Sequence, residues 1–577
     1  MAHASIDPLT LEVFWSRLIA VVNEQATSLI WSAFSPSVAE AGDISACAFD
    51  SRGYMIAQAV TGTPGHINSM ARCIQHFLDA YPLETLEPGD VLITNDPWKT
   101  SGHLHDVTIV TPIFRNGEVV AFFGNICHLA DIGGRPFSAD ARELFEEGLF
   151  IPMTKLFMAG KPNEELLKII RANVREPEAV VGDLYAMTAA NDVGGERLLE
   201  FMDEFGMERI EPLADEVINR SERAMREAIA RIPDGVYRHQ VTMDGYDQPV
   251  TLAVAITVRG SDMFIDYTGT SPESDYGINV VMNYTEAYTT FGIKCALVPD
   301  VPNNEGSFRP VHITAPEGSI LNCRPPAPVA GRHIIGQWLP GVVHGALAQA
   351  MPDRVLAEGS LNLWSTQFTG VDRDDRPFTM LFFNSGGMGA RPNKDGLSST
   401  AFPSGVMGTP AEIVEARSPL MMVRREFRTD SGGPGTYRGG LGHWMVIRGV
   451  NAGKPYRFSP FFDRTTNPAS GYQGGKNGAP GVYELSDGRR PNPKATIWVD
   501  PDTDIIMGLP GGGGYGDPLD RDPQAVRDDV LDELVSPERA RDDYGVVLTP
   551  DLEIDWDATE RLRTQGRRRS CVDAGTK

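Results

Sequence analysis

Two apolar runs of the sequence form a hairpin signal, and the residues that flank it are candidate metal ligands: His103, His105, Asp106 and His128. The runs are Val107–Phe114 and Val119–Ile126, and both are rich in β-branched and aromatic residues. Imidazole nitrogens and a carboxylate oxygen together suit Zn²⁺, Mn²⁺ or Fe²⁺. If the two runs pair, these side chains return to one end of the hairpin.

The four residues between the runs read Arg-Asn-Gly-Glu, and Asn-Gly favours a type I′ turn because both of its residues take positive φ. Pairing of Arg115 with Glu118 predicts two opposed pairs, with about one residue of slack for the turn type: His105–His128 and Asp106–Cys127. Strand alternation would place His105 on the face of His128. His103 and Asp106 meet only if the backbone bends at Leu104. The alternative is that these histidines satisfy backbone groups at the end of a sheet.

A second hairpin signal precedes the first, in the stretch EAGDISACAFDSRGYMIAQA. Its turn is Asp50-Ser51-Arg52-Gly53, Asp43 opens its first strand, and its second strand leads to His66. A helix predicted over Ile67–Ala80 separates the two hairpins. We therefore expect Asp43 and His66 near the open end of one hairpin, as the four residues above lie near the open end of the other.

The chain begins with a predicted helix that extends to about Phe34, with Asp7 as N-cap and Pro8 in the first turn. Glu24 and Asn23 lie within it, and they belong either to a solvated face or to a site. From Asp140 to about Ile232 the pattern is also helical. That stretch contains a polar cluster that is either part of a site or a set of helix caps: Arg171, Asn173, Arg175 and Asp183.

After Gly235 the pattern becomes a β-meander, with strands predicted over Tyr237–Met243, Thr251–Val258 and Met263–Tyr267. Residues 268–516 are dense in Gly and Pro, and their strand order is not predicted. Acidic helices follow over 523–534 and 537–544, and the last dozen residues read as a frayed tail. The sequence predicts an α+β multi-domain protein divided into an α+β region with the candidate metal site, a β-rich region and a short helical segment, at residues 1–232, 233–520 and 521–577.

The composition describes an acidic protein of 577 residues, with 52 Lys and Arg against 77 Asp and Glu and a net charge of −25. This charge disfavours nucleic acid and anionic membrane surfaces as partners. The six cysteines form no CxxC pair, which fits reduced thiols rather than a disulfide framework. No signal peptide or membrane span is evident, so we expect a cytoplasmic protein.

Several formal motif matches do not predict cofactor binding. Residues 511–516 (GGGGYG) match GxGxxG, but Asp517-Pro518 follows instead of a helix, so a flexible or backbone-approach loop is expected. The chain contains neither GxxxxGK[ST] nor GxSxG. Cys127 and His128 are adjacent on a strand and point to opposite faces, which argues against a nucleophilic pair. We predict no nucleotide cofactor bound by this chain.

Long stretches of the sequence resemble the hydantoinase B/oxoprolinase family. These are NDPWKTSGHLHD with HLADIGG, EAGDISACAFDSRG, NVREPEAVVGDLYA, VPNNEGSFRPV, TDSGGPGTYRGGLG and LPGGGGYGDPLDRDP. The resemblance covers nearly the whole chain. That family includes the B-type component of ATP-dependent N-methylhydantoinase, the C-terminal part of 5-oxoprolinase, and subunits of acetone and acetophenone carboxylases.

The resemblance implies a divalent metal, Zn²⁺ or Mn²⁺, with four ligands: Asp43, His103, Asp106 and His128. His105 falls on a variable position of the family pattern and is displaced from the set. Leu129 stands where many relatives have a second histidine, so any proton transfer by that histidine is absent here. His66 and Glu24 are the candidate catalytic residues, and for His66 a structural role is the alternative.

The resemblance also implies a partner. In relatives, a hydantoinase A-type ATPase subunit phosphorylates a carbonyl oxygen of the substrate, and the B-type subunit completes the reaction. The expected function is therefore the B-type subunit of an ATP-dependent hydrolase of cyclic amides (hydantoins, 5-oxoproline or lactams) within a hetero-oligomer. The alternatives are a subunit of an ATP-dependent ketone carboxylase and a non-catalytic scaffold subunit.

Overall fold

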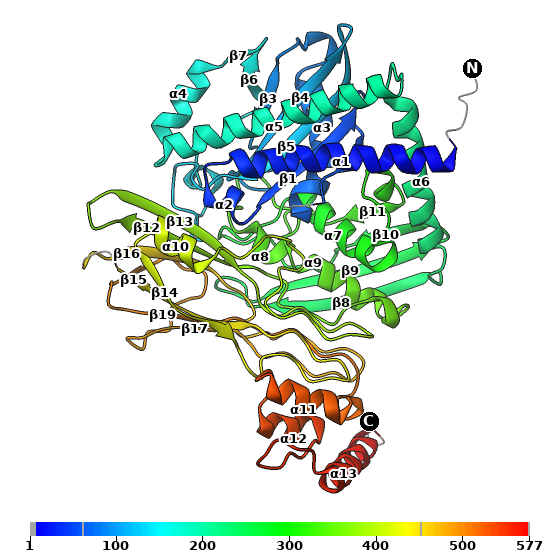
Figure 1. The fold of residues 1–577 in the computed structure, drawn as a ribbon, viewed down its shortest axis with the longest axis vertical. Coiled ribbons are helices and arrows are strands. Elements are labelled where there is room, and N and C mark those ends of the chain that lie inside the picture. Colours follow the sequence, from blue (N-terminus) through cyan, green and yellow to red (C-terminus); the bar gives the residue numbers. More distant parts are fainter. Residues whose placement is uncertain (1–6, 61–62, 451–452, 575–577) are drawn as a thin grey trace.

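The computed structural model describes residues 7–60, 63–450 and 453–574, with side chains to residue 567. Expectations for residues 1–6 and 575–577 lie outside the described residues. The fold is a mixture of helices and several sheets, as expected. Figure 1 shows a helix-covered sheet at one end, β-rich parts in the middle and a group of C-terminal helices at the other end. In the described ranges, no helix is both long and apolar enough to cross a membrane.

Seven strands form the first sheet, in the order β2-β1-β5-β4-β3-β6-β7, and every pairing is antiparallel. Their bounds are Ile44–Asp50 (β1), Met55–Gln58 (β2), Val91–Thr94 (β3), Asp106–Arg115 (β4), Glu118–His128 (β5), Thr154–Met158 (β6) and Lys161–Pro162 (β7). Both predicted hairpins, β1–β2 and β4–β5, are confirmed. Because β1 also pairs with β5, the two hairpins lie side by side.

Helices cover both faces of this sheet. Helices α1 (Pro8–Ser32) and α5 (Pro177–Glu204) lie along one face, and α3 (Pro64–Ala80) packs on the other (Figure 1). Alternate residues of β1 enter two different apolar clusters, Ala46 and Ala48 toward α1 and Cys47 and Phe49 toward α3. The predicted start of α1 is confirmed, since Asp7 Oδ1 accepts hydrogen bonds from the N–H groups of Leu9 and Thr10.

The register of the β4–β5 hairpin differs by one residue from the prediction. The turn is as expected, with Asn116 at φ 52° and Gly117 at φ 83°. Near the turn Arg115 pairs with Glu118, but a β-bulge interrupts the ladder between Ile113 and Phe114. Beyond the bulge Asp106 therefore faces His128 rather than Cys127. The bulge supplies the one-residue slack that the sequence could not locate.

The prediction of continuous helix over residues 140–232 was partly wrong. Edge strands β6 and β7 occupy part of it, because β6 pairs with β3 and completes that side of the sheet. The helices that follow are α4 (Glu164–Asn173), α5 and α6 (Glu211–Ile229). Two members of the predicted polar cluster make structural contacts. Asp183 accepts hydrogen bonds from the N–H groups of Phe34 and Ser35. Arg175 is paired with Asp131 at 2.6 Å.

The predicted meander forms a second sheet, in the order β11-β10-β9-β8. Its strands are Gly235–Met243 (β8), Val250–Arg259 (β9), Asp262–Asp266 (β10) and Val311–Thr314 (β11), and the last is parallel to its neighbour. Helices α7 (Met282–Leu297), α8 (Arg332–Gly336) and α9 (Leu339–Leu347) lie between this sheet and the first (Figure 1). One apolar cluster extends from Leu11 to Phe461 and crosses the boundary expected at 232/233, so that boundary does not separate two cores.

Two further four-stranded sheets share an apolar core of their own. Their orders are β13-β12-β16-β18 and β14-β15-β19-β17. The strands are Trp364–Val371 (β12), Pro377–Asn384 (β13), Leu420–Phe427 (β14), His443–Gly449 (β15), Tyr456–Phe461 (β16), Val482–Leu485 (β17), Ile497–Val499 (β18) and Ile505–Gly508 (β19). Short helices α2 (Pro36–Ala39) and α10 (Ala411–Arg417) lie beside them.

Extended glycine-rich segments continue from these sheets and pack backbone against backbone. We call them the glycine layer: residues 386–390, 432–440, 471–478 and 511–516. Gly512 donates its N–H to Gly440 O at 2.9 Å and accepts from Gly433 N at 2.8 Å. A Cβ on Gly512 would lie 2.1 Å from Met388 O, so any side chain there is excluded. The close backbone approach expected for GGGGYG is confirmed.

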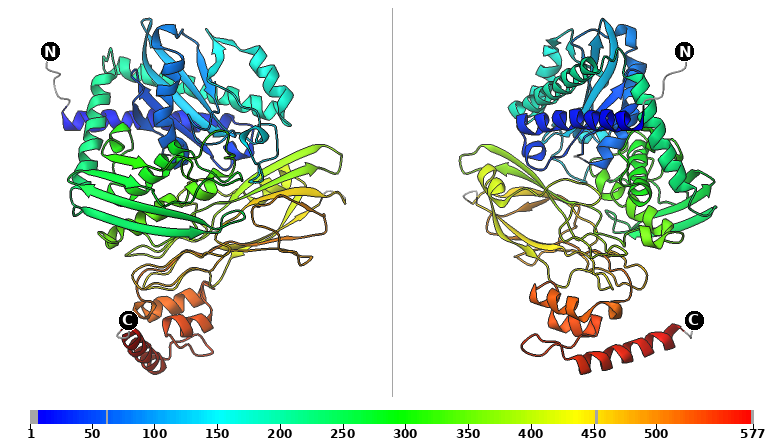
Figure 2. Two further views of the ribbon diagram at one scale, coloured as in Figure 1. Left: turned by 180° about the vertical axis from the view of Figure 1, so that it is seen from behind. Right: turned by 45° about the vertical axis from the view of Figure 1, so that its right-hand side comes forward.

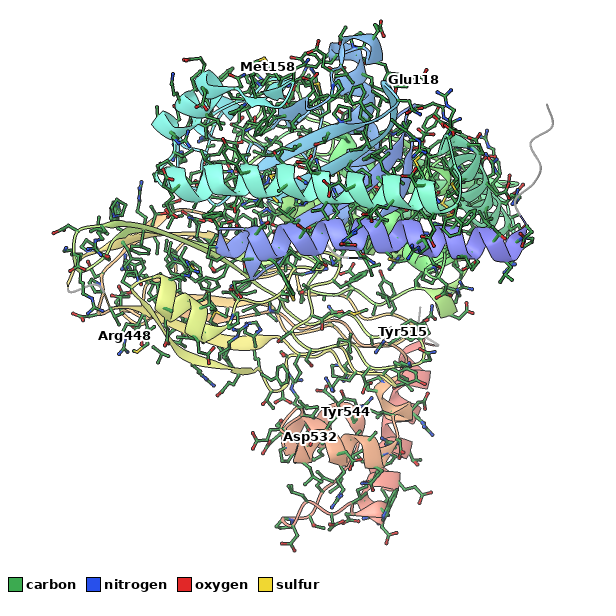
Figure 3. The ribbon with its side chains drawn as sticks, turned by 45° about the horizontal axis from the view of Figure 1, so that its top comes forward. Glu118, Met158, Arg448, Tyr515, Asp532 and Tyr544 are labelled. Carbon is green, nitrogen blue, oxygen red and sulfur yellow. The ribbon has the colours of Figure 1, made fainter. Side chains whose placement is uncertain are left out.

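The C-terminal helices form a small unit that projects from the rest of the chain (Figure 2). They are α11 (Pro523–Leu531), α12 (Pro537–Tyr544) and α13 (Trp556–Ala574), and Tyr544 lies in their apolar cluster (Figure 3). The prediction of a frayed tail was wrong for the residues that the structure describes, because α13 continues to Ala574. Arg563 Nε holds this helix through a 3.0 Å hydrogen bond to Tyr544 O.

Candidate metal centre

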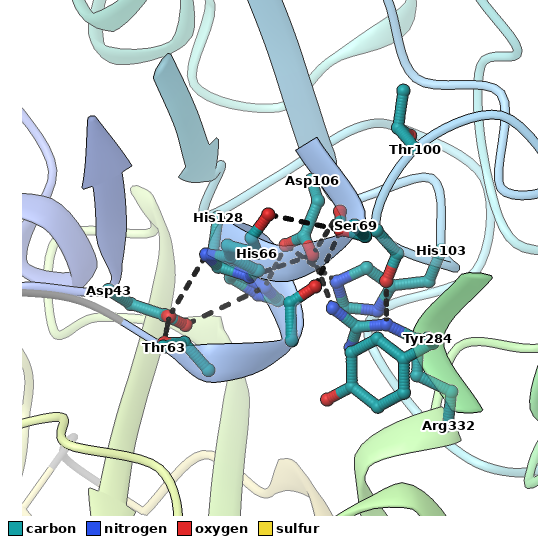
Figure 4. A network of polar contacts seen from close by, with 12 residues as sticks. Asp43, Thr63, His66, Ser69, Thr100, His103, Asp106, His128, Tyr284 and Arg332 are labelled. Atoms are coloured by element: carbon teal, nitrogen blue, oxygen red, sulfur yellow. Dashed lines mark hydrogen bonds and ion pairs between the residues drawn. The ribbon is translucent and has the colours of Figure 1, made fainter. Parts of the chain in front are cut away.

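The candidate ligands converge because three neighbouring strands begin or end at one edge of the first sheet. Asp43 immediately precedes β1, His128 ends β5 and Asp106 begins β4, and these strands are adjacent in the order β1-β5-β4. His128 N–H donates to Asp43 O at 3.2 Å, which ties the two chain segments together. His66, in the first turn of α3, lies next to these residues (Figure 4).

A turn before β4 brings His103 and Asp106 together. Gly102 has φ 94°, and Asp106 N–H donates to His103 O at 3.3 Å, so the backbone bends where the sequence required it. His103 Nε2 lies 2.7 Å from Asp106 Oδ1. Strand alternation therefore does not apply at His103, because the strand starts only at Asp106.

The nitrogen and oxygen atoms of three candidate ligands form a compact buried group. One ligand atom from each of His103, Asp106 and His128 lies within 4.8 Å of the others. His103 Nδ1 donates to Ala330 O at 2.9 Å, so Nε2 carries the lone pair that a metal needs. Burial, reinforced by Arg332, lowers the pKa of His103 to about 3 and keeps the ring neutral. A neutral imidazole is the form that binds metal.

The two oxygens of Asp106 have different neighbours. Oδ2 contacts His66 Nε2 at 2.9 Å, Ser101 Oγ at 2.7 Å and the guanidinium of Arg332. Oδ1 faces His103 Nε2 and His128 Nδ1, the latter at 3.2 Å. Burial opposes ionisation, but Arg332 and the imidazoles outweigh it and hold the pKa of Asp106 well below its usual range. Oδ1 is thus the oxygen left to serve as a ligand.

Asp43 lines the cavity at this centre, and His66 lies near both its carboxylate and that of Asp106. Asp43 Oδ1 accepts a 2.8 Å hydrogen bond from Thr63 Oγ1, and its carboxylate lies 3.8 Å from His66 Nδ1 and 4.0 Å from His128 Nδ1. For His66, burial alone would lower the pKa, but Asp106 and Asp43 outweigh it and raise the pKa above its ordinary value. His66 thus favours a proton more than His103 and His105, whose pKa values burial lowers.

Several buried ring nitrogens have no hydrogen-bond partner within the described residues: His66 Nδ1, His103 Nε2, His105 Nδ1 and His128 Nε2. Buried polar atoms are normally satisfied, so their concentration here points to a missing ligand. His105 itself stacks on His128 with ring centroids 5.3 Å apart and supports that ring. Two imidazoles and two carboxylates suit Zn²⁺ or Mn²⁺.

The cavity at this centre holds about 30 Å³ and is lined in part by residues that the sequence did not suggest. Arg332, from α8, lies with its guanidinium carbon 4.2 Å from the ring centroid of Tyr284, on α7. His333 hydrogen-bonds Ser365 Oγ at 3.2 Å, and burial lowers its pKa well below the ordinary value. Arg332 and His333 lie in the apolar segment GRHIIGQW, more than 200 residues from the ligands, and no local pattern marks them.

Glu147 supports the centre from outside the cavity. Its Oε1 accepts hydrogen bonds from the N–H groups of Val329 and Ala330, at 2.7 and 2.8 Å. Ala330 O in turn accepts the hydrogen bond from His103 Nδ1–H. Glu147 therefore holds in place the carbonyl group that orients a candidate ligand. Burial raises the pKa of Glu147 to about 8.

Two sequence expectations need comment. Glu24 lies on the solvent side of α1, where it pairs with Arg197 at 2.8 Å, and it is not among the residues that line the cavity. Its expected catalytic role is therefore corrected: the helix turns its neighbour Gln25 inward instead. Leu129 is fully buried in the apolar core, so this position supplies no proton-transfer group.

Comparisons with known proteins identify the family and the fold. The family described as hydantoinase B/oxoprolinase matches residues 7–518. A putative D-/L-hydantoinase component of the B type, from Pseudomonas sp. strain NS671, is 31% identical, over 97% of this chain and 98% of the relative. The crystal structure of ATP-dependent caprolactamase from Pseudomonas jessenii superposes with a TM-score of 0.90 at 29% identity, over 97% of this chain and 100% of that one. Nucleotide-free acetone carboxylase shares the fold, with a TM-score of 0.86 at 21% identity over 98% of this chain and 84% of that one.

Proposed function

The chain belongs to the hydantoinase B/oxoprolinase family, and we propose that it is the B-type subunit of an ATP-dependent hydrolase of cyclic amides. The relatives that support this assignment are named as a B-type component of a hydantoinase and an ATP-dependent caprolactamase. Both names describe opening of a cyclic amide. Because the hydantoinase relative is named as one component of several, it also supports a partner, for which we propose a hydantoinase A-type ATPase subunit.

The observation that carries the proposal is the buried group of His103, Asp106 and His128, whose ligand atoms lie within 4.8 Å of one another. Together with Asp43 they would hold Zn²⁺ or Mn²⁺. When bound, such an ion supplies Lewis acidity for activating a nucleophile. Arg332 and Ser101 orient Asp106, and Ala330 O orients His103, so the ligand set is preorganised.

We expect the ATPase partner to activate the amide and this subunit to complete its hydrolysis. The ATPase subunit would transfer the γ-phosphoryl group to the amide carbonyl oxygen, which makes the carbonyl carbon electrophilic. Water then adds to this carbon, the bond from carbon to the ring nitrogen breaks, and that nitrogen takes up a proton. A second water hydrolyses the resulting acyl phosphate to phosphate and the carboxylic acid of the open chain. His66, held by Asp106, would take the proton from the attacking water, a role that contributes about 10²–10⁴-fold.

The ketone carboxylase remains the second candidate, supported by the shared fold with acetone carboxylase. At 21% identity that likeness concerns the fold alone. Both candidates use the same ligand set, so substrate-dependent ATP hydrolysis must separate them. Co-purification with the A-type protein and assays over hydantoins, lactams, oxoproline and ketones would do so. Stimulation by ketone and bicarbonate, but by no cyclic amide, would reject the hydrolase.

A scaffold role is tested by His103→Ala. We expect the variant to lose bound metal, measured by elemental analysis, and to lose substrate-stimulated ATP-dependent ring opening. The control is His312→Ala, because His312 is an exposed histidine that pairs with Asp262 far from the centre. If His103→Ala keeps both its metal content and the activity of the complex, the chain is a scaffold.

A further inference from the structure

The cavity at the metal centre is too small for a cyclic substrate. Its volume of about 30 Å³ has room for only a few water molecules. A second cavity of about 550 Å³ lies beside it, and this volume is in the range of small-molecule sites. The body of any substrate must therefore lie outside the small cavity, and the larger one has the required size.

The two cavities lie on opposite sides of one wall. The wall consists of the first turn of α3 and the segment 401–406. On α3, His66 faces the small cavity, whereas Pro64 and Ile67 face the large one. Ser404 lines both cavities. A substrate in the large cavity would thus have its reactive carbonyl directed past Ser404 toward the metal centre.

The large cavity is mostly apolar, and Lys294, which is partly buried, supplies a cation in its wall. Aliphatic and aromatic side chains dominate the lining, among them Ile19, Ile67, Phe291, Pro299, Phe402 and Pro403. Lys294 Nζ donates to Val301 O at 2.6 Å and to Val298 O at 3.4 Å, which leaves one N–H free. No carboxylate of the described residues lies within ion-pair distance of Lys294, although an exposed aspartate, Asp300, lines the same cavity. Burial lowers the pKa of Lys294 to about 8, so the amine is still largely charged at pH 7.

A partly buried ammonium without a counter-charge loses part of its hydration, and pairing with an anion offsets that loss. Hydrogen bonds to Val298 O, at the C-cap of α7, and to Val301 O in the following loop stabilise Lys294 in part. They do not neutralise its charge, and a cavity of ligand size lies against it. An anionic group on the ligand would supply the missing charge.

We propose that the large cavity holds the apolar body of the substrate and that Lys294 pairs with a carboxylate on it. The substrate class is then a cyclic amide that carries both a carboxylate and an apolar portion. This inference rests on the proposed function, because it assumes that the substrate of the metal centre is a cyclic amide.

The test compares two ligands that differ in one group, a ring with a free carboxylate and the same ring with a primary carboxamide. Binding of each to the purified complex without ATP is measured by calorimetry, in wild type, in Lys294→Met and in Lys168→Met. Lys168 is an exposed lysine paired with Glu165 on α4 and serves as the matched control. We expect wild type and Lys168→Met to bind the acid at least about tenfold more tightly than the amide, as one charge-assisted hydrogen bond would give. In Lys294→Met the two ligands should bind equally.

Equal binding of acid and amide to wild type would overturn the proposal, as would an unchanged preference in Lys294→Met. If Lys294→Met does not fold, Ala401→Trp replaces it, because a bulky side chain there should fill the cavity. That variant should weaken both ligands at least about tenfold with unchanged metal content, and unweakened binding would overturn the proposal. The proposed function fails separately, if no cyclic amide is opened in an ATP-dependent reaction by the wild-type complex.

Discussion

The metal centre and most of the glycine layer are buried and dense in polar atoms, but they differ in how those atoms are satisfied. At the metal centre, ring nitrogens of several histidines have no partner within the described residues. In the glycine layer, N–H and C=O groups of neighbouring segments pair with one another, as those of Gly512, Gly433 and Gly440 do. Unsatisfied buried side chains point to a ligand, whereas satisfied buried backbone points to structure alone.

This difference explains why two sequence motifs have different meanings. GHLHD concentrates side chains with lone pairs at the start of a strand, where three chain segments meet. GGGGYG removes side chains so that backbones can touch. Glycine density in this family member therefore marks packing, and a phosphate-binding interpretation of GxGxxG does not apply to it.

The largest expected effect comes from Asp106→Asn at the metal centre. The substitution keeps the size of the side chain but removes the charge that pairs with Arg332 and faces two imidazoles. We expect loss of bound metal and a fall in ring-opening activity of at least about 10³-fold, because several kcal/mol of ligand and orientation energy are lost. Metal content and ATP-dependent activity are the measurements.

The matched control for Asp106→Asn is Asp90→Asn. Asp90 is also fully buried and paired, with Lys155 at 2.6 Å, but it lies at the start of β3 away from the centre. It should keep the metal and the activity even if the protein becomes less stable. Full metal occupancy in Asp106→Asn would contradict the ligand set.

The second largest effect is expected for Gly512→Ala in the glycine layer. The new Cβ would lie 2.1 Å from Met388 O, and neither backbone can move without breaking the hydrogen bonds of the layer. We expect destabilisation of about 4 kcal/mol or more, or failure to fold. Urea unfolding measures it. Gly235→Ala is the control, because its Cβ would meet only ordinary contacts with Tyr237 at 3.7 Å, and it should change stability by less than about 1 kcal/mol.

Local patterns carried most of the correct predictions. The two hairpins, the capped first helix and the meander follow from turn residues and periodicity within short windows. The convergence of Asp43 with the β4–β5 residues follows from the pairing of β1 with β5, which no local signal specifies. The family resemblance supplied that part of the ligand set.

Other features depend on contacts between distant segments and could not be predicted from the sequence. The bulge at Ile113 shifts the register by one residue without any marker in the sequence. Arg332 and Glu147 act on the centre from elements far along the chain, and each looks like an ordinary charged residue in its own segment. The apolar core also continues across the boundary expected at residue 232 into the second sheet, a contact between distant segments that no local pattern marks.

A smaller effect is expected when glutamine replaces Glu147, because the substitution removes a group that titrates. With its pKa raised to about 8, the folded state holds a proton that the unfolded chain releases above about pH 4.5. Stability from this group is therefore complete below pH 4.5 and falls as the pH rises toward 8. Glu147→Gln should flatten that decline, seen as a smaller change in the urea midpoint between pH 5 and pH 8. Exposed Glu143→Gln should leave the decline as in wild type, and a steep decline in Glu147→Gln would contradict the assignment.

The smallest effect separates two neighbours on α1, Glu24 and Gln25. Successive helical residues differ by about 100° in direction, so one faces solvent and the other the first sheet. Glu24 pairs on the surface with Arg197, which also has Glu200 as a partner, so Glu24→Ala should change neither activity nor metal content measurably. Gln25 is buried and donates to Gly124 O and Asn191 Oδ1, so Gln25→Ala should cost about 1–3 kcal/mol in urea unfolding. Loss of activity in Glu24→Ala with metal retained would mean that the solvent face of α1 meets a catalytic surface in the assembled complex. Retention of activity would confine the chemistry to the edge of the sheet where β1, β5 and β4 meet.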